Sequence, residues 1–394
     1  MNIKELETPC FIIDTDEFKA NLNDFKRALR KYYPNGILGY SVKTNSLAYI
    51  LKIVKENNVF AEIVSHDEYD LAEYIGFKNK IIYNGPLKTK ETFLNALKSG
   101  AYVNIENFQE IEWLKDIPKM EKYNLGIRLN INLDIVSPED SGDYGESRFG
   151  FEYENGEFIV AIKMIKKYGF QLKGIHIHRT SKTRSLEVYE KLCVYVSKII
   201  KQENLFLEYI DIGGGFYGHL KEKPNYEDYI KVIYDNLQVD KNIKVIIEPG
   251  NGVIASPVCF MMSVYDIKTL NGKCICSVDG SRIDIDPLFH KKSYEYTIFT
   301  ENKKKIEKKS QIITGCTCLE NDRLFEIRQN SGKLFRGDKI VIKDVGAYTM
   351  TLSPNFIRFQ PNVYAYMEEK GYFPVRKKWG CKEIIQGFCY QEGE

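Results

Sequence analysis

The sequence lacks the features that mark several large classes of protein. Its 394 residues include only 5 histidines and 2 tryptophans, and 56 basic residues are offset by 54 acidic ones. A formal net charge of +2 gives little electrostatic attraction to nucleic acid or to a membrane surface. No run of about 18 apolar residues is present, so we expect no helix that spans a bilayer. We therefore expect neither nucleic acid nor membrane among its partners.

The 9 cysteines are an odd number scattered over a long chain, which fits free thiols better than a disulfide framework. Residues 1–8 are charged and lack the apolar centre of a signal peptide, so we predict a cytoplasmic protein. Two close pairs occur, Cys274 with Cys276 and Cys316 with Cys318. Both sulfurs of such a pair point to one face of a strand. Since no histidine or further cysteine stands at ligand spacing, we predict no metal site.

Short apolar runs alternate with helical patterns over the first two thirds of the chain. Each run is read as a strand, and apolar residues spaced three and four apart follow most of them. The predicted strands cover residues 37–40, 59–64, 80–83, 102–105, 125–129, 174–177, 209–212 and 245–247. Polar or glycine residues stand at nearly every strand end, which is typical of the mouth of a (β/α)8 TIM barrel. An open doubly wound sheet needs them at one switch point only.

The pattern changes after about residue 252, where helical periodicity nearly vanishes. Short alternating strands at residues 264–267, 274–278, 294–299, 311–314 and 339–342 indicate an all-β domain. An isolated strand at residues 8–14 precedes the first helix and is expected to complete that domain. The predicted architecture is an α/β barrel over residues 26–262. A β-sandwich or β-barrel domain follows it, built from residues 1–25 and 263–394.

Three of the strand ends carry side chains that suit catalysis. Lys43 follows the first barrel strand at the start of a polar turn. His176 and His178 lie on one face of their strand. They are either two metal ligands or, as we favour, one packing histidine and one that faces the mouth. Glu248 ends the last strand, where a carboxylate is costly unless it pairs with a cation or a ring N–H.

A run of three glycines, Gly213 to Gly215, directly follows the predicted strand at residues 209–212. Without Cβ atoms, consecutive glycines let backbone N–H groups close around an anion such as a phosphate, although a flexible turn has the same composition. The run lacks the spacing of a dinucleotide fingerprint, and there is no P-loop lysine. The four strand ends together suit pyridoxal 5′-phosphate (PLP). Lys43 would hold it covalently, His178 would stack on its ring, the glycines would bind its phosphate and Glu248 its pyridine nitrogen.

Further short motifs occur in a fixed order. They are Tyr40-Ser41-Val42-Lys43-Thr44-Asn45, Asn84-Gly85-Pro86, Ser147-Arg148-Phe149-Gly150, His176-Ile177-His178, Gly213 to Gly215, Glu248-Pro249-Gly250, Val278-Asp279-Gly280, Cys318 with Asp322, and Gly346-Ala347-Tyr348. In these motifs and their spacing, from Thr8 to about Tyr364, the chain resembles the fold-type III PLP-dependent decarboxylases. That family includes diaminopimelate, ornithine, arginine and carboxynorspermidine decarboxylases.

The resemblance implies an alanine-racemase-like fold that works as a head-to-tail homodimer with shared active sites. Cys318 would enter the site from the neighbouring subunit and protonate Cα after CO₂ leaves. Tyr348 and Ser181 resemble residues that lie at the cofactor phosphate, and Gly250 belongs to the cofactor-binding Glu-Pro-Gly motif. Glu248 would keep the pyridine nitrogen protonated, whereas the related alanine racemases place an arginine there, so decarboxylation is favoured over racemisation.

Three positions depart from the family pattern. Asn251 stands where an arginine usually follows Glu-Pro-Gly, and Leu319 stands where diaminopimelate decarboxylases have a glutamate. Asp286 precedes Pro287, where those enzymes carry an arginine that holds a substrate carboxylate. From these differences we expect a substrate other than meso-diaminopimelate.

The substrate end of the site has several candidate residues. Arg179 and Arg184 follow the histidine motif and either lie in an exposed loop or replace the missing arginines, since a guanidinium can hold a carboxylate by two hydrogen bonds. Asp286 could face a distal amine, and Arg282 and Asp322 are further candidate contacts.

The predicted function is decarboxylation of an amino acid or an amino-acid derivative, in amino-acid or polyamine metabolism. One alternative is a racemase or epimerase on the same fold. Another is a non-catalytic PLP-binding protein of the single-domain barrel type, which the complete second domain disfavours.

Overall fold

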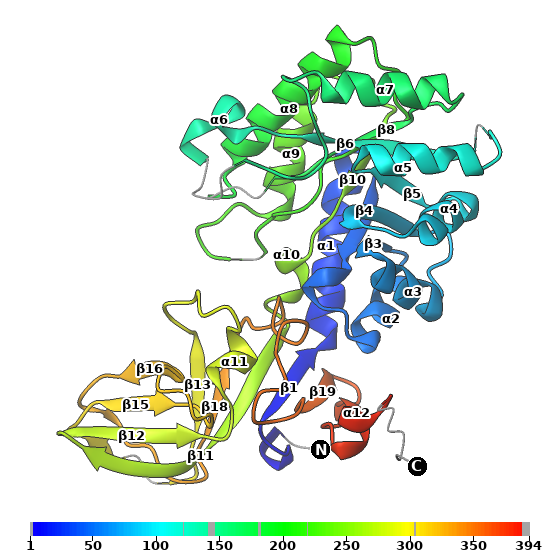
Figure 1. Ribbon diagram of the computed structural model, residues 1–394. Helices are drawn as coiled ribbons and strands as arrows, with labels where there is room; N and C mark the ends of the chain where they lie inside the picture. Colours follow the sequence, from blue (N-terminus) through cyan, green and yellow to red (C-terminus); the bar gives the residue numbers. More distant parts are fainter. Residues whose placement is uncertain are drawn as a thin grey trace, which may run out of the picture. The chain divides into compact units, whose positions relative to one another are not determined.

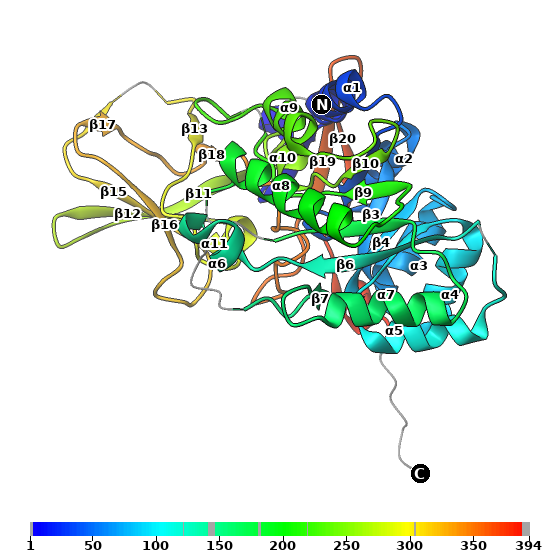
Figure 2. The same cartoon turned by 90° about the horizontal axis from the view of Figure 1, so that it is seen from above.

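The computed structural model describes residues 3–120, 122–140, 146–179, 183–218, 220–302 and 305–387 (Figures 1 and 2). Ser181, which the family resemblance assigns to the cofactor phosphate, lies outside the described residues. The chain divides into two compact units, one of residues 19–253 and one of residues 1–18 with 254–394. Each unit is treated by itself below.

Within the described residues, eight parallel strands of the first unit close into a barrel, because β5 pairs with β6 at the ends of the order β5-β4-β3-β2-β10-β9-β8-β6. The strands are β2 (Ile37–Ser41), β3 (Phe60–Ser65), β4 (Ile81–Leu87), β5 (Tyr102–Ile105), β6 (Asn124–Asn130), β8 (Gly174–Ile177), β9 (Tyr209–Asp211) and β10 (Lys244–Ile247), with the short β7 (Phe151–Glu152) paired to β6. Each barrel strand begins within 1 residue of its predicted start. The barrel prediction is therefore confirmed.

Helices alternate with these strands along the chain (Figure 2). They are α1 (Thr15–Tyr32), α2 (Ala48–Glu56), α3 (His66–Ile75), α4 (Lys90–Ser99), α5 (Phe108–Trp113), α6 (Leu133–Val136), α7 (Glu157–Lys167), α8 (Leu186–Gln202), α9 (Tyr226–Asn236) and α10 (Asn251–Ile254), with 3-10 turns η2 (Val42–Thr44), η3 (Leu114–Asp116) and η4 (Pro138–Asp140). Local sequence sets several of their ends. Thr89 and Thr92 form a capping box at the start of α4, and Gly100, with φ +88°, ends it in the left-handed region that suits glycine.

The second unit is built mainly from strands. They are β1 (Cys10–Asp14), β11 (Val258–Leu270), β12 (Lys273–Val278), β13 (Tyr296–Phe299), β14 (Ile306–Glu307), β15 (Gln311–Thr314), β16 (Arg323–Ile327), β17 (Ser331–Gly332), β18 (Lys339–Ile342), β19 (Asn362–Met367) and β20 (Gly371–Arg376), with η1 (Ile3–Glu5), α11 (Arg282–Ile285) and α12 (Cys381–Ile385). The N-terminal strand β1 lies between β11, antiparallel to it, and β19, parallel to it (Figure 1). The N-terminal strand thus completes the β-domain, as predicted.

The two cysteine pairs have different surroundings. Cys274 and Cys276 are both buried on one face of β12, as a strand requires. The strand β15 ends at Thr314, as predicted, so Cys316 and Cys318 lie in the loop after it. The turn occurs at Gly315, where a Cβ would approach within 2.2 Å of the Asp322 carboxylate. All cysteines in the described part of the chain are free thiols.

The barrel interior is layered. An apolar floor contains Ile82, Tyr102, Tyr209 and Ile246, packed with Ile37 and Phe60. Nearer the carboxyl ends of the strands lies a polar ring that takes one buried side chain from, or directly after, each barrel strand. Its members are Ser41, Glu62, Asn84, Asn104, Arg128, His176, Asp211 and Glu248, each no more than 7% exposed. Buried polar groups at this density must be paired with one another or with a ligand.

Among the described residues, no helix has both the length and the apolar character needed to cross a membrane.

Candidate active site

Lys43 lies in the turn η2, directly after β2, and is paired with a carboxylate. Its Nζ donates to Glu62 Oε2 at 2.6 Å, and Ser41 Oγ donates to the same oxygen. The Lys43 side chain is 38% exposed, whereas that of Glu62 is 1% exposed. The ammonium group therefore stands at the rim of the barrel with its counter-ion inside.

Sequence reasoning missed Glu62. The signal was available, because an acidic residue inside the apolar run of β3 is rarely buried without a partner.

Asn84 links Glu62 to Glu248. Asn84 Nδ2 donates to Glu248 Oε1 at 2.6 Å and to Glu62 Oε1 at 3.3 Å. The lysine at the end of β2 and the carboxylate after β10 thus belong to one hydrogen-bonded network. Since β2 and β10 are neighbours in the barrel, Lys43 and Glu248, which the sequence singled out, follow adjacent strands.

Glu248 and Asp211 form a coupled pair of buried acids. Burial raises the pKa of Glu248 well above its usual value, and the nearby Asp211 and Glu62 carboxylates raise it further. Burial also raises the pKa of Asp211 to about 7. Since the two carboxyl groups hydrogen-bond each other, we take the pair to hold one shared proton. The site therefore has an excess of buried negative charge, which a protonated ring nitrogen beside Glu248 would relieve.

The raised pKa of Asp211 predicts a pH effect on the stability of the PLP-free protein. In the native state Asp211 keeps a proton that the unfolded chain has lost, so its favourable contribution is complete below about pH 4 and is lost as the pH rises through about 7. We expect Asp211→Asn to remove this loss. Between about pH 5 and about pH 8, the melting temperature of the wild type should fall about 2–4 °C more than that of the variant. Parallel melting curves at both pH values would contradict the assignment.

The two histidines differ in their contacts. His178 Nδ1 accepts a hydrogen bond from Gly214 N at 3.3 Å, so this nitrogen carries no proton. Burial and the positive charge of Arg128 lower the pKa of His178 to about 3, which keeps the ring neutral. His176 is buried, its pKa is lowered by burial, and neither ring nitrogen has a hydrogen-bond partner among the described residues.

His176, Asp211 and Glu248 also have ligand-type atoms within 4.8 Å of one another. This is the one arrangement among the described residues that resembles an ion site. Glu248, which the sequence predicts at the pyridine nitrogen, belongs to this group, and the prediction that no metal binds here is kept.

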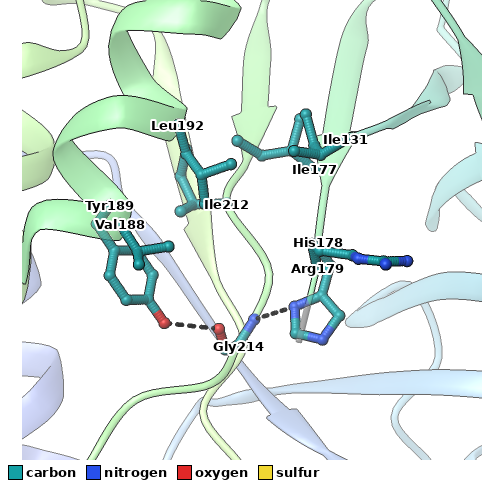
Figure 3. Close-up of a pocket in the computed structure, with 9 residues that line it drawn as sticks. All are labelled: Ile131, Ile177, His178, Arg179, Val188, Tyr189, Leu192, Ile212 and Gly214. Carbon is teal, nitrogen blue, oxygen red and sulfur yellow. Dashed lines mark hydrogen bonds between the residues drawn. The ribbon is translucent and has the colours of Figure 1, made fainter. Parts of the chain in front are cut away.

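The glycine run after β9 has the geometry that its composition predicts. Gly213 and Gly215 have φ values of +73° and +94°, and a Cβ on Gly214 would lie 2.3 Å from the Glu248 carbonyl oxygen. Glycine is therefore required here. Tyr189 Oη donates to the Gly214 carbonyl at 3.0 Å and fixes that peptide (Figure 3). The N–H groups of Gly213 and Gly214 donate to Asp211 Oδ1 at 2.9 Å and to His178 Nδ1 at 3.3 Å, so the Gly215 N–H is the group of this run that can face a phosphate.

Arg179 follows His178 and lines a small cavity at the glycine run (Figure 3). Arg184 adopts a left-handed φ of +52°, and its guanidinium lies 5.5 Å from the centre of the Tyr217 ring. Tyr229 Oη donates to the Arg184 carbonyl oxygen at 2.8 Å. Arg179 thus lies at the glycine run, and Arg184 lies beside Tyr217.

Gly250 closes the site against the lysine turn. A Cβ at this position would lie 2.1 Å from Thr44 Oγ1, the side chain next to Lys43. The Glu-Pro-Gly motif therefore needs its glycine because the chain after β10 passes directly over η2.

A second buried carboxylate, Glu106, organises the opposite side of the mouth, and sequence reasoning missed it as well. It accepts from Arg128 Nη1 at 2.6 Å, from Gly85 N at 3.0 Å and from Gly150 N at 3.1 Å. Arg128 Nη2 also donates to the His178 carbonyl oxygen at 3.1 Å. Three of the family-like motifs, those around Gly85, Gly150 and His178, are thus joined through Glu106 and Arg128.

In the second unit, Cys318 is exposed in a loop organised by Asp322. The Asp322 carboxylate accepts from Thr317 N at 3.0 Å, from Thr317 Oγ1 at 2.6 Å and from Arg282 N at 2.8 Å. Tyr348 is 40% exposed and has a φ of +56°, which is uncommon for a tyrosine and often marks a functional position.

Asp286 is 5% exposed, and both of its carboxylate oxygens accept hydrogen bonds from neighbouring residues. It accepts from the Arg282 guanidinium at 2.9 and 3.1 Å, from the backbone N–H groups of His290 and Lys291 and from Tyr294 Oη. These contacts hold the segment after α11 together.

Residues 16–255 match the family described as "Pyridoxal-dependent decarboxylase, pyridoxal binding domain". The chain belongs to this family, and it is accordingly a PLP-dependent carboxy-lyase that acts on an amino-acid-type substrate. The racemase and the non-catalytic alternatives are set aside by the same match.

The particular relatives are diaminopimelate decarboxylases. The chain is 27% identical to the probable chloroplastic enzyme of Oryza sativa over 92% of this chain and 76% of that protein. It is 25% identical to the enzyme of Methanocaldococcus jannaschii over 96% of this chain and 90% of that protein. The crystal structure of the M. jannaschii enzyme has a TM-score of 0.85 at 22% identity, over 99% of this chain and 94% of that one. The crystal structure of a lysine/ornithine decarboxylase from Vibrio vulnificus has a TM-score of 0.73 at 22% identity, over 93% of this chain and 96% of that one.

The expectation of a substrate other than meso-diaminopimelate is contradicted by these relatives, which are named diaminopimelate decarboxylases and match most of the chain. The sequence argument rested on two missing arginines, where Asn251 and Asp286 stand, and on Leu319. In the structure Asp286 is buried and engaged by Arg282 and other donors of its own segment. The residue type at this position is therefore a poor guide to what the site binds.

The described residues fit PLP. The chain at Gly214 passes too close to the Glu248 carbonyl oxygen to carry a Cβ. Burial raises the pKa values of Glu248 and Asp211, and a protonated ring nitrogen of PLP would place a positive charge beside these acids. Lys43 offers an amino group at the rim of the same ring of polar residues.

Proposed function

We propose that this protein removes a carboxyl group from meso-diaminopimelate and releases CO₂ and lysine. The relatives that carry this activity in their names support the substrate. One observation supports the chemistry above all. Lys43 and Glu248 stand at the ends of adjacent strands and are joined through Glu62 and Asn84.

PLP, when bound, accepts the electron pair left as the Cα–carboxylate bond breaks. In the proposed mechanism Lys43 holds the cofactor through Nζ, and Glu248 holds a proton at its ring nitrogen. The glycine run binds its phosphate, and the remaining cofactor contacts are His178, Ser181, Gly250 and Tyr348. Cys318 then gives its Sγ proton to Cα, so that a hydrogen replaces the lost carboxyl group.

We further propose that the active unit is a head-to-tail homodimer in which Cys318 serves the site of the other subunit. Exposure of Cys318 and Tyr348 supports a role at an interface. Mixing and refolding two variants, Lys43→Ala and Cys318→Ala, should then restore activity, because hybrid dimers contain one intact site. If the mixture is no more active than its parts, the shared site is wrong.

At the substrate end, Arg179 and Arg184 stay candidate contacts for a carboxylate, and Arg282, Asp286 and Asp322 stay candidates through the segments they organise. The free thiols of the described residues are compatible with the proposed cytoplasmic location.

The substrate can be tested directly with purified protein and PLP. We expect CO₂ and lysine from meso-diaminopimelate, with kcat/KM at least about 10²-fold above that for L-lysine or L-ornithine, because a site that pairs polar substrate groups rejects analogues that lack them. The LL and DD isomers report which Cα configuration reacts. Release of CO₂ from ornithine but not from diaminopimelate would overturn the proposal.

Cys318→Ala should keep the bound cofactor and its absorption spectrum but lower kcat by about 10²-fold, since one positioned acid contributes about that much. Cys381→Ala is the matched control, because Cys381 is also an exposed thiol of the second unit. Full activity of the Cys318 variant would show that another group supplies the proton.

A further inference from the structure

A line of three buried polar side chains connects the barrel floor to the carboxyl groups of Glu62 and Glu248. Tyr209 Oη donates to Asn104 Oδ1 at 2.9 Å, and Asn104 Nδ2 donates to Asn84 Oδ1 at 2.8 Å. Asn84 Nδ2 then donates to Glu248 and Glu62. Tyr209, Asn104 and Asn84 are at most 2% exposed, so water does not compete for these bonds.

The direction of donation is fixed at both ends of this line. Glu62 Oε1 and Glu248 Oε1 both accept from this side chain, and only the NH₂ group of an asparagine amide can donate, so it must face the two acids. The Asn84 oxygen then faces Asn104 and must receive a donor. Burial raises the pKa of Tyr209 well above its usual value, so its hydroxyl stays a donor and turns the oxygen of Asn104 toward itself. Each amide makes three hydrogen bonds, since Asn104 Nδ2 also donates to Asp211 Oδ2 at 3.4 Å, and a flip would lose them.

Two glycines make room for this arrangement. A Cβ on Gly126 would lie 2.1 Å from Asn104 Oδ1 and 2.2 Å from Tyr209 Oη. A Cβ on Gly174 would lie 2.1 Å from Tyr209 Cζ. Side chains at these two positions of β6 and β8 would fill the space that the Tyr209 ring occupies. The barrel interior is thus shaped so that a floor tyrosine can reach the polar ring.

We propose that Asn84, oriented by Asn104 and Tyr209, is a positioning residue that holds the carboxylates of Glu62 and Glu248 in register and keeps Glu248 ionised toward the cofactor ring. The inference rests on the proposed roles of Lys43 and Glu248. It adds that one amide donates to both carboxyl groups. A change at Asn84 should therefore affect Glu62, which pairs with Lys43, and Glu248 together.

Other charged groups act on Glu248 and must be considered with it. Asp211 on β9 and Glu62 on β3 raise its pKa, and Lys43 lowers it. His176 on β8 has Nε2 3.7 Å from Glu248 Oε2 and is neutral, as its lowered pKa implies. Arg128 on β6 acts on Asp211 and lowers its pKa. Since Asn84 donates to Glu248 at 2.6 Å, its loss should make Glu248 easier to protonate.

The test is the pH dependence of PLP retention, measured by equilibrium dialysis and the absorption band of the bound cofactor. For Asn84→Leu, which keeps the branching of the side chain but has no donor, we expect the pH below which PLP is lost, the acid limb of retention, to rise by about 1 pH unit and PLP to bind about 10-fold more weakly at neutral pH. Tyr209→Phe should move the limb in the same direction by a smaller amount. Asn84→Gln, which keeps the amide, should restore part of the shift.

Tyr33→Phe is the matched control for Tyr209→Phe. Tyr33 is 2% exposed, and its hydroxyl has no partner among the described residues, so its removal deletes a buried hydroxyl without breaking a network. A purely structural role would lower the melting temperature but leave the acid limb in place. The inference is overturned if the limbs of Asn84→Leu and Tyr209→Phe coincide with those of the wild type and Tyr33→Phe. If the wild type itself binds no PLP, the proposed function fails instead.

Discussion

Replacing Lys43 with alanine is expected to remove the visible absorption band of bound PLP and to lower kcat by at least about 10³-fold, as is usual when a covalent group is deleted. No second amine is expected to take its place. Lys43 is the residue that pairs with the buried Glu62, at 2.6 Å. PLP should still bind weakly through the glycine run, so the variant should lose the covalent signature before it loses all affinity.

Lys52→Ala is the matched control for this variant. Lys52 lies on α2, its side chain is 68% exposed, and it stands 4.0 Å from Glu56, so its replacement should leave both the spectrum and the rate unchanged. A Lys43→Ala protein that keeps the band would refute the assignment of the cofactor lysine, whatever its activity.

Replacing Glu248 with glutamine is expected to lower kcat by about 10²–10³-fold, because the neutral amide no longer favours a proton on the ring nitrogen. The shape of the side chain is kept, and the carbonyl oxygen of the glutamine amide can still accept from Asn84 Nδ2. PLP-free Glu248→Gln should be at least as stable as the wild type at neutral pH. The substitution removes one of two coupled buried acids whose pKa values are raised by burial, and active-site charges commonly reduce stability.

Glu227→Gln provides the control, since Glu227 pairs with Lys31 at the surface and should affect neither property. Two measurements decide the outcome: kcat, and the melting temperature of the PLP-free protein. If Glu248→Gln decarboxylates at the wild-type rate, the carboxylate is not needed at the ring. If the variant is much less stable, Glu248 is a structural residue.

The hydrophobic periodicity and the residue types at the strand ends were enough to predict the barrel. Nearly every predicted strand ends in polar or glycine residues, which an apolar strand does not require for its own stability. Lys43, the glycines at 213–215 and Glu248 stood out for this reason. The N-terminal strand was recognised because it precedes the first helix and stands apart from the repeating strand–helix units. These features are local in sequence, and the fold confirms the architecture that they predicted.

The partners of these residues could not be found in the same way. Glu62 and Asn84 act through hydrogen bonds between strands that lie far apart in the chain, and Asn84 and Glu248 are separated by 164 positions. The substrate argument failed for a related reason. It treated Asp286 as facing a ligand, whereas its oxygens are engaged by Arg282 and by backbone N–H groups of the same segment. Residue type alone does not report the direction in which a side chain points.

The polar ring has a consequence for the lifetime of the protein. Acidic and amide side chains buried together in one ring make folding without the cofactor costly, and a ligand that binds only the native state stabilises it by mass action, about 2.7 kcal/mol at 100 times its dissociation constant. We therefore expect PLP to act as a folding ligand as well as a cofactor. In a cell short of vitamin B6, molecules without PLP would unfold and be degraded more often, so that the amount of enzyme, and not only its activity, follows the supply of the vitamin.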